Sequence, residues 1–264
     1  MFISPMLLHK SDAPFDDSRY ITELKLDGIR LIYSVDSDGK VRLYSRHNNE
    51  ITAKFPELLT LDLPPGTTLD GELIVSNKEG KPDFEAMMSR FQAGAKLAES
   101  KPVTFVAFDV IQHEGNRVTK LPLLERKAVL ADIMPTDSER LAKSQYIEGN
   151  AFAYYEAIKA QALEGIVLKR KDSRYQVGKR SHDWLKVINY QYADVYVTGF
   201  RRDPFGAYLA DADGRYLGVM ELGVPPKARA RIYSLREGDR LACRVKYRNL
   251  TSAGLLRLPS FVEW

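Results

Sequence analysis

The sequence contains one cysteine among its 264 residues, four scattered histidines and no long apolar run. A lone cysteine, Cys243, excludes a disulfide within the chain and is typical of a reducing compartment, so we expect a cytoplasmic protein. The histidines lack the spacing of a zinc site. No apolar stretch approaches the roughly 18 residues that cross a bilayer, and the first residues show no export signal. We therefore expect no membrane partner.

Excess charge of one sign is missing from most of the chain. Residues 1–190 carry 27 basic and 27 acidic residues, whereas residues 191–264 carry 12 basic and 8 acidic residues. The whole net charge of +4 therefore lies in the last segment. This distribution indicates a polyanionic partner, although scatter of charge over a solvated surface explains it equally well.

Two common phosphate-binding motifs are also missing. The sequence contains no G-x-x-x-x-G-K-[ST] and no G-x-G-x-x-G placed after a strand. If the protein binds a nucleotide, it does so without a Walker loop and without a dinucleotide-binding fold.

The pattern of apolar residues predicts an α+β fold dominated by antiparallel hairpins. Residues 23–34 predict one strand, and D-S-D-G at 36–39 predicts the turn that leads to its hairpin partner. Asp83 is a candidate N-cap of a helix, and residues 150–165 predict another helix that ends at a glycine.

The composition changes after Tyr190. Short strands follow, with one predicted helix at 225–235, and this pattern predicts a small closed barrel such as an OB-fold. We therefore expect two domains, 1–190 and 191–264.

Charged residues interrupt several of the predicted strands. Because side chains alternate between the two faces of a strand, Glu23 and Lys25 should share one face. By the same parity Asp70 and Glu72 share a face. The alternative interpretation is that each strand has one face in solvent and that these charged residues lie on that face.

An aromatic residue occupies a comparable position in residues 105–111. Strand parity predicts that Phe108 shares its face with Val106 and Val110, and that Asp109 lies on the other face.

Five of the charged residues would form a mixed pocket if the strands were brought together: Lys25, Glu72, Glu164, Lys169 and Lys186. Buried charges are tolerated when they are paired or bound to a ligand. Lysines suit phosphates, and carboxylates suit ribose hydroxyls and Mg²⁺. This combination predicts a site for a nucleoside triphosphate and its metal.

The segment K-L-D-G-I-R at 25–30 resembles the K-x-D-G-x-R signature of covalent nucleotidyltransferases, which include DNA ligases, RNA ligases and mRNA-capping enzymes. Five further segments resemble the other motifs of this family in the same order: 44–48, 69–75, 105–111, 164–170 and 179–187. With the ending at 250–261, they are most similar to small bacterial ATP-dependent DNA ligases, including the ligase module of end-joining enzymes.

The resemblance implies an antiparallel-sheet, ATP-grasp-like nucleotidyltransferase (adenylation) domain followed by an OB-fold domain. It implies an ATP-dependent DNA ligase that joins a 5′-phosphate to a 3′-hydroxyl through a lysyl–AMP intermediate and adenylated DNA. An RNA ligase or a capping-type nucleotidyltransferase is the alternative. The expected cofactors are ATP and Mg²⁺, with Mn²⁺ as a substitute.

The resemblance also assigns roles to individual residues. Lys25 would be the nucleophile, supported by Asp27 and Lys186. The residues expected at the nucleotide are Glu23 at the adenine, Phe108 stacked on it, Glu72 at the ribose, and Arg30, Arg46, Lys169, Arg180 and Lys186. The expected metal ligands are Glu164 and Glu72. The expected DNA contacts are Arg201, Arg202, Arg244, Lys246 and Arg248.

One position departs from the family pattern. The second lysine of a frequent K-x-K motif is replaced by Ile188, so either the triphosphate is held differently or another residue serves in its place. We expect a monomer that acts on nicked duplex DNA in repair, recombination or replication, with end-joining or repair proteins as candidate partners.

Overall fold

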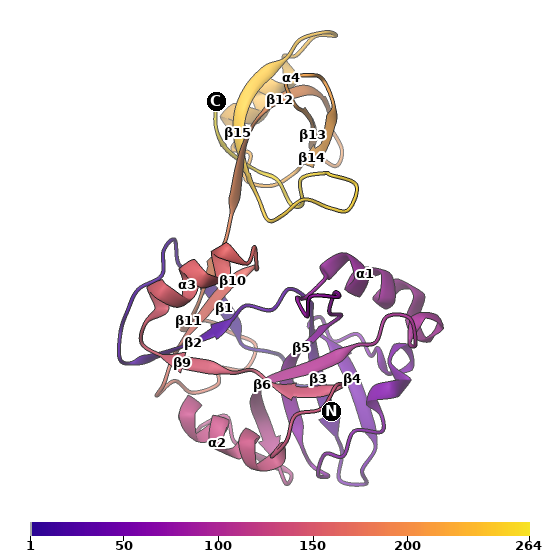
Figure 1. Ribbon diagram of the computed structural model, residues 1–264, viewed down its shortest axis with the longest axis vertical. Helices are drawn as coiled ribbons and strands as arrows, with labels where there is room; N and C mark the ends of the chain where they lie inside the picture. Colours follow the sequence, from indigo (N-terminus) through magenta and orange to yellow (C-terminus); the bar gives the residue numbers. More distant parts are fainter. Residues whose placement is uncertain (1) are drawn as a thin grey trace. The chain divides into compact units, whose positions relative to one another are not determined.

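The computed structural model describes residues 2–264 and divides the chain into two compact units, Met1–Ile188 (unit 1) and Asn189–Trp264 (unit 2). Figure 1 shows the elements of both units. The predicted domain boundary after residue 190 lies two residues beyond this division. Both units are rich in strands, and the predicted α+β class is confirmed.

The first sheet of unit 1 has the strand order β1-β11-β10-β2-β9. Its strands are β1 (Leu7–Lys10), β2 (Tyr20–Leu24), β9 (Tyr146–Glu148), β10 (Gly165–Arg170) and β11 (Arg180–Ile188). All neighbours in this sheet are antiparallel except β1 and β11, which are parallel.

The second sheet of unit 1 has the order β4-β3-β5-β6-β7, and β8 pairs with β6 in parallel. Its strands are β3 (Ile29–Val35), β4 (Val41–Ser45), β5 (Thr68–Ile74), β6 (Thr104–His113), β7 (Asn116–Arg117) and β8 (Leu141–Lys143). The hairpin predicted at D-S-D-G joins β3 to β4, where Val35 pairs with Val41.

Three α-helices flank the sheets of unit 1: α1 (Phe84–Ala93), α2 (Leu123–Ile133) and α3 (Ala151–Ala160). Three short 3₁₀ helices lie at Thr52–Lys54, Pro56–Leu58 and Gly94–Leu97. Asp83 caps α1 as predicted, because its side chain accepts a 2.9 Å hydrogen bond from the Ala86 amide. Helix α2 packs on β6 and α3 packs on β10.

The single strand predicted for residues 23–34 is wrong, because the chain changes sheets within it. Strand β2 ends at Leu24 in the first sheet, and β3 begins at Ile29 in the second sheet. Gly28 lies in the crossing, where a Cβ atom would collide with the carbonyl oxygen of Leu73. A residue without a side chain is needed for this close approach.

Apolar residues from both sheets pack together between them. Strand β3 sends Leu31 and Tyr33 into the core of the second sheet, while Ile32, on the opposite face, joins Ile21 and Trp184 of the first sheet. Because side chains alternate, the face of β3 that carries Ile32 also carries Arg30.

The prediction that Phe108 and Val110 share one face of β6 is wrong. The pairing register shifts between Ala107 and Asp109, opposite Gly71 and Asp70, which is the signature of a β-bulge. The bulge leaves Phe108 facing the core between the sheets and returns Val110 to the core of the second sheet.

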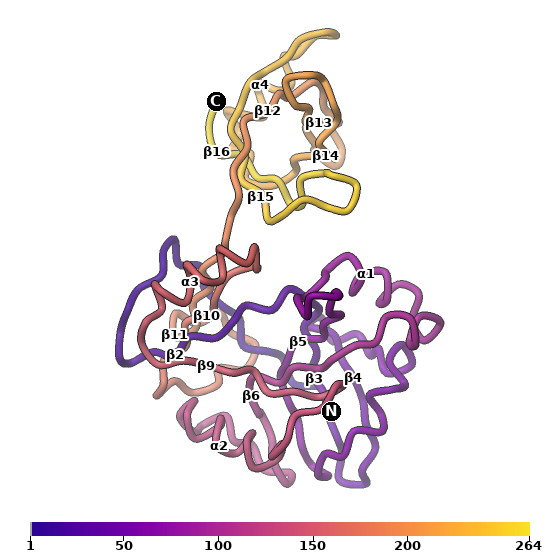
Figure 2. The backbone as a smooth tube through the Cα atoms, in the orientation of Figure 1, coloured from indigo at the N-terminus to yellow at the C-terminus, as the bar shows by residue number. Residues whose placement is uncertain are grey.

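Unit 2 is a five-stranded barrel of the OB type with the strand order β14-β13-β12-β15-β16. Its elements are β12 (Gln191–Arg201), β13 (Gly206–Ala210), β14 (Tyr216–Met220), α4 (Pro226–Tyr233), β15 (Leu241–Tyr247) and β16 (Ser260–Glu263). A bridge between Leu222 and Ser260 links the two ends of the sheet, and Figure 2 shows the strands curling into a ring. Cys243 lies in the apolar core of this barrel, 4% exposed.

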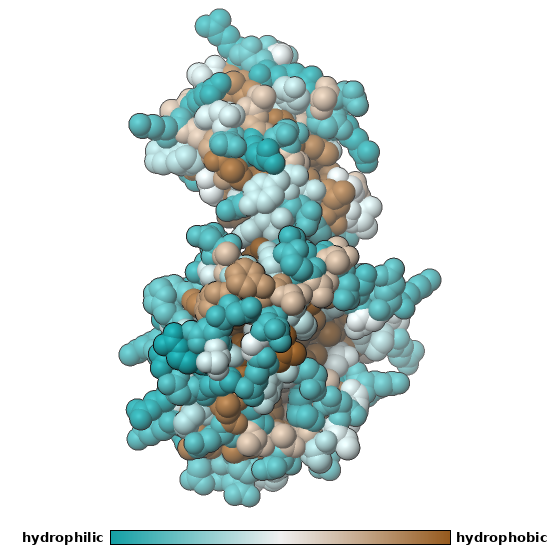
Figure 3. All heavy atoms as spheres, turned by 60° about the vertical axis from the view of Figure 1, so that its left-hand side comes forward, coloured by the Kyte–Doolittle hydropathy of each residue, from teal (hydrophilic) through white to brown (hydrophobic). Residues whose placement is uncertain are grey.

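The surface in Figure 3 is mostly hydrophilic, with small apolar patches between charged side chains. None of the helices formed by residues 2–264 has both the length and the apolar character of a membrane span.

Candidate active site

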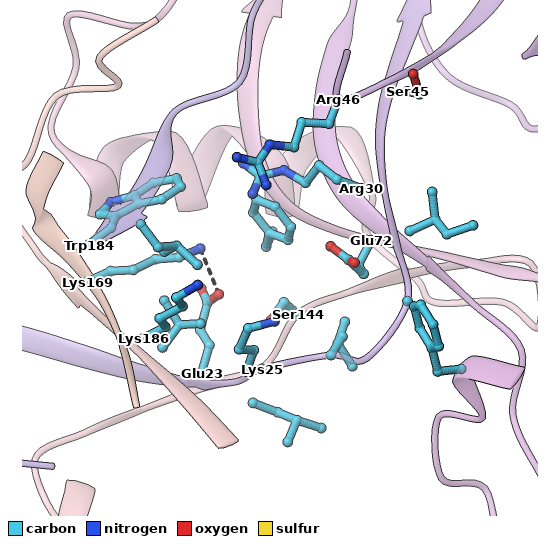
Figure 4. A pocket seen from close by; sticks show the side chains of 18 of the residues that line it. Glu23, Lys25, Arg30, Ser45, Arg46, Glu72, Ser144, Lys169, Trp184 and Lys186 are labelled. Atoms are coloured by element: carbon cyan, nitrogen blue, oxygen red, sulfur yellow. Dashed lines mark ion pairs between the residues drawn. The ribbon is translucent and has the colours of Figure 1, made fainter. Parts of the chain in front are cut away.

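A cavity of about 600 Å³ opens in unit 1 and is lined by residues of both sheets and of α1 (Figure 4). The first sheet contributes Glu23, Val167, Lys169, Trp184 and Lys186. The second sheet contributes Arg30, Ser45, Glu72 and Phe108, and α1 contributes Phe84, Met88 and Phe91. A space of this size matches pockets that hold small organic molecules.

Lys25 lies in the wall of this cavity, just after β2. Its amide donates a 2.9 Å hydrogen bond to the Gly165 carbonyl, which fixes its backbone against β10. Its Nζ lies 2.8 Å from Glu164 Oε2, and the two side chains are 20% and 8% exposed. Gly165 has a φ of +144°, and a Cβ atom there would collide with the Val187 carbonyl, so glycine is required beside Glu164.

Glu23 lies at the centre of a buried cluster of charges. Its Oε1 forms an ion pair with Lys127 of α2, and its Oε2 lies 2.7 Å from Lys169 Nζ. Burial favours the neutral form of Glu23, but the two lysines outweigh burial and lower its pKa. The carboxylate is therefore held ionised in the floor of the cavity.

Lys169 also contacts two aromatic rings. Its Nζ lies 4.4 Å from the ring centre of Phe108 and 4.3 Å from that of Trp184, within the range of cation–π attraction. Burial lowers the pKa of Lys169 to about 8, and Lys127 adds to this shift while Glu23 opposes it.

Arg30 is fixed by a network of hydrogen bonds behind its guanidinium. Its Nε and Nη2 both donate to Asp70, at 2.5 Å, and Nη2 donates to the Met6 carbonyl at 3.1 Å. The Tyr175 hydroxyl donates to the same carboxylate at 2.5 Å. The guanidinium lies 4.5 Å from the ring centre of Phe108. This network positions a permanent positive charge at the cavity.

Glu72 is opposite Arg30 in the register of β3 and β5, and its carboxylate points into the cavity (Figure 4). Burial raises the pKa of Glu72 to about 7, and the Glu164 charge adds to this shift while Lys25 and Arg30 oppose it. A cation near Glu72 would favour its ionised form.

The structure brings most of the predicted nucleotide-site residues together. Figure 4 shows Arg46 reaching into the cavity from the loop after β4, beside Arg30, and Lys186 beside Lys169. Asp27 and Glu164 are not among the lining residues, although Glu164 reaches Lys25.

Arg180 is also outside the set of lining residues. Its Nη1 donates a hydrogen bond to the Leu8 carbonyl, and the side chain is exposed at the start of β11. This contact ties β11 to the edge strand β1.

The five predicted DNA contacts fall in two places on unit 2. Arg244 and Lys246 lie on β15, where they pair with Asp194 and Tyr192 of β12. Arg248 follows this strand, and the Arg248 guanidinium and the Lys246 amine both lie over the ring of Tyr190, at 5.3 and 4.9 Å.

The other two candidates lie at the far end of β12. Arg201 forms an ion pair with Glu221 and donates to the Pro204 carbonyl at 3.0 Å. The Arg202 guanidinium lies 4.7 Å from the ring centre of Tyr233 in α4. Arg201 therefore already has an anionic partner within unit 2.

Two groups of residues at the site were given no role from the sequence. Lys127 occupies the apolar stripe of α2, four residues after Leu123 and three before Leu130, and a lysine in such a stripe is the signal that could have identified it. The pairing of Asp70 with Tyr175 depends on residues far apart in the sequence and has no local signal.

The fold and the site together define a class of protein. A two-sheet unit with a lysine and carboxylates in its cavity, followed by an OB-type barrel, is the architecture of the nucleotidyltransferase ligases. Residues 5–187 match the family described as ATP dependent DNA ligase domain. The chain belongs to this family of ATP-dependent DNA ligases, as its sequence motifs predicted.

Curated relatives support the assignment over different lengths. The SPbeta prophage-derived DNA ligase-like protein LigB of Bacillus subtilis is 45% identical, and the match covers all of this chain and 99% of that protein. The bifunctional non-homologous end joining protein LigD of Bacillus subtilis is 30% identical over 84% of this chain. The match spans only 38% of that longer protein.

A solved structure agrees with the fold. The ligase domain of LigD from M. tuberculosis is 26% identical and superposes with a TM-score of 0.64, over 99% of this chain and 94% of that domain.

Proposed function

We propose that the protein seals nicks in duplex DNA, using ATP, through a covalent adenylate on Lys25. The observation that carries this proposal is the position of Lys25 Nζ, in the cavity wall and 2.8 Å from a buried carboxylate oxygen of Glu164. Membership of the family supports the overall reaction.

In the first step the Lys25 amine attacks the α-phosphorus of ATP. A nitrogen–phosphorus bond forms, the bond to the bridging oxygen breaks, and pyrophosphate leaves. An amine attacks only when it is neutral, and Glu164 Oε2 lies within hydrogen-bond reach of the proton that Lys25 must lose. Lys169, Lys186 and Arg30 supply the positive charge that stabilises the phosphates.

In the later steps the adenylate leaves Lys25 for the 5′-phosphate of the nick. The nitrogen–phosphorus bond breaks as a phosphate–phosphate linkage forms. The 3′-hydroxyl then attacks the 5′-phosphorus, which closes the strand and releases AMP. We assign Arg46 to the incoming 5′-phosphate, because it reaches the cavity from an exposed loop, and Asp27 to these later steps.

The base and ribose of ATP would be held by residues of both sheets. Glu23, ionised by its two lysines, is suited to accept a hydrogen bond from the adenine amino group. Phe108, 9% exposed at the cavity, is suited to stack on the purine, and Glu72 to accept hydrogen bonds from the ribose. Arg180 would join this set only after giving up its contact with the Leu8 carbonyl.

Glu72 and Glu164 fit a magnesium site. Mg²⁺ in nucleotide enzymes is held by one or two carboxylates together with substrate phosphates. Burial raises the pKa of Glu72, and the nearby Glu164 charge adds to this shift, so a cation shared by the two carboxylates would favour the ionised form of Glu72. Among residues 2–264 no group of three acidic, histidine or cysteine ligands converges, so substrate oxygens and water would complete the coordination.

Mass spectrometry tests the first step. After incubation of the full chain with ATP and Mg²⁺, we expect one added AMP on the peptide that contains Lys25. The K25A variant should carry none, because no other amine occupies this position, and should fail to seal a labelled nicked duplex. Added AMP on K25A, or sealing by it, would contradict the scheme.

The choice of nucleotide and strand separates a DNA ligase from the alternatives. Incubation with GTP in place of ATP should give no adduct, whereas a capping-type enzyme would prefer GTP. Nicked duplexes with DNA or RNA at the nick distinguish a DNA ligase from an RNA ligase.

A further inference from the structure

The buried cluster around Glu23 contains one cation more than its anion needs. Glu23 is 2% exposed, Lys169 is 2% exposed and Lys127 is 8% exposed, and both lysines form ion pairs with the one carboxylate. A single lysine would neutralise Glu23, and a buried excess positive charge is costly unless an anion joins it. The cluster is therefore prepared for an additional negative group.

The two lysines differ in their access to the cavity. Lys169 and Glu23 line it, and Figure 4 shows Lys169 directed toward Glu23 near Lys186. Lys127 extends from α2 and is not among the lining residues. Lys169 is therefore the cation that a ligand in the cavity can reach.

Removing Lys169 from Glu23 would leave a buried carboxylate without a partner if Lys127 were absent. Loss of one partner from a buried ion pair is strongly destabilising, because the remaining charge is left buried and uncompensated. With Lys127 in place, Glu23 keeps an ion pair when Lys169 turns away. Lys127 thus lowers the cost of moving Lys169 to another anion.

We propose that Lys127 is a positioning residue that holds Glu23 so that Lys169 is available to the phosphates of the bound nucleotide. The inference rests on the proposed function and deepens it, because it separates recognition of the base from recognition of the phosphates. Glu23 remains at the base with Lys127, and Lys169 moves to the α-phosphate.

The groups around Lys169 support this division. Lys169 faces two charged residues near its amine, Glu23 from β2 and Lys127 from α2. The other groups around Lys169 come from two strands: Phe108 and Asp109 from β6, and Trp184 and Lys186 from β11. Lys127 lowers the pKa of Lys169, as expected for a second cation that weakens the hold of Glu23 on it.

Equilibrium binding to the K25A variant tests the proposal without chemistry, and two ligands separate the two contacts. The variant is titrated with ATP and with adenosine, which has the base and ribose but no phosphate. Addition of K127M should weaken ATP binding by at least about tenfold, because Lys169 stays with Glu23. Adenosine binding should change less than about twofold, and K127R should restore ATP binding because its charge is kept.

A matched control is K171M, which removes another ion-paired lysine, bound to Glu148 and outside the cavity lining. It should leave both affinities unchanged, and thermal unfolding checks that each variant is folded. In the E23Q background the effect of K127M on ATP binding should disappear, because no carboxylate then retains Lys169.

Three results would overturn the proposal: equal weakening of ATP and adenosine by K127M, no weakening of ATP in a folded K127M protein, or an unchanged K127M effect in the E23Q background. Absence of any ATP binding by the K25A protein would instead contradict the proposed function itself, and the inference with it.

Discussion

The two units of the molecule differ in how deeply their ion pairs are buried. In unit 1, Arg126 and Asp109 form an ion pair, and both side chains are fully buried. Arg126 Nε donates to Asp109 Oδ1 and Nη2 donates to Oδ2, each at 2.8 Å. In unit 2, Arg244 and Asp194 are 3.8 Å apart with side chains 48% and 81% exposed. Unit 1 therefore buries several of its ion pairs, whereas Arg244, Lys246 and Arg248 of unit 2 lie beside tyrosine rings.

Under the proposed function, this difference separates the chemical step in unit 1 from binding to DNA by unit 2. Buried pairs hold side chains in one geometry and shift their pKa values, which suits a reaction centre. Exposed cations contribute little to stability but attract phosphates over a distance set by the salt concentration. We therefore propose that unit 1 carries out the reaction and that the cations of unit 2 attract a polyanion.

The largest expected effect comes from breaking a buried pair in unit 1. R126A leaves the buried Asp109 carboxylate without its cation, although the hydrogen bond from the Val110 amide remains, and it also removes hydrogen bonds to the carbonyls of Leu121 and Ser173. We expect it to lower the free energy of unfolding by about 3–5 kcal/mol. The measurement is urea denaturation followed by tryptophan fluorescence, to which Trp184 contributes from an apolar core of unit 1.

The matched variant in unit 2 is R244A, with an expected change within about 0.5 kcal/mol. Equal destabilisation by R126A and R244A would show that the contrast between the two units is wrong.

A second comparison uses salt. The double variant R244A/K246A should bind a nicked duplex less tightly, and the slope of log affinity against log salt should fall by about 2, close to 0.9 for each lost phosphate contact. The amount of AMP adduct formed without DNA should not change. If the double variant showed the same slope of log affinity against log salt as the unmodified protein, Arg244 and Lys246 of β15 would not contact DNA phosphates.

The third comparison uses pH, because the buried Glu72 should make the stability of unit 1 depend on pH. The pKa of Glu72 is raised from 4.5 to about 7 by burial, so the folded state holds a proton that the unfolded state has lost between these pH values. Stability should therefore fall as the pH rises from about 4.5 to about 7. Urea denaturation at several pH values should show a weaker fall in E72Q, and an identical fall would exclude Glu72 as its source.

Much of the site could be predicted because its residues follow local patterns. Lys25, Glu72, Lys169 and Lys186 each lie in or beside a strand with recognisable neighbours, and all four line one cavity. Their individual roles remain predictions. The OB-type barrel was also predictable, from a run of short strands with one helix.

The rest depends on how distant segments pack. The contact of Lys127 with Glu23 exists only because α2 packs against β6 beside the first sheet, and no residue near Glu23 in the sequence indicates it. The change of sheet at Gly28 and the bulge after Phe108 were missed because both reflect pairing with another strand. Arg180 and Arg201 have protein partners that the sequence pattern does not show.

The solitary thiol of Cys243 has a practical consequence. It lies in the core of the barrel, and burial raises its pKa to about 11, so little of it is thiolate at neutral pH. A cysteine introduced at an exposed position such as Tyr192 would therefore be the fast-reacting site for maleimide dyes, without prior removal of the native one. Labels placed on one unit at a time can then report fluorescence changes as a nicked duplex arrives.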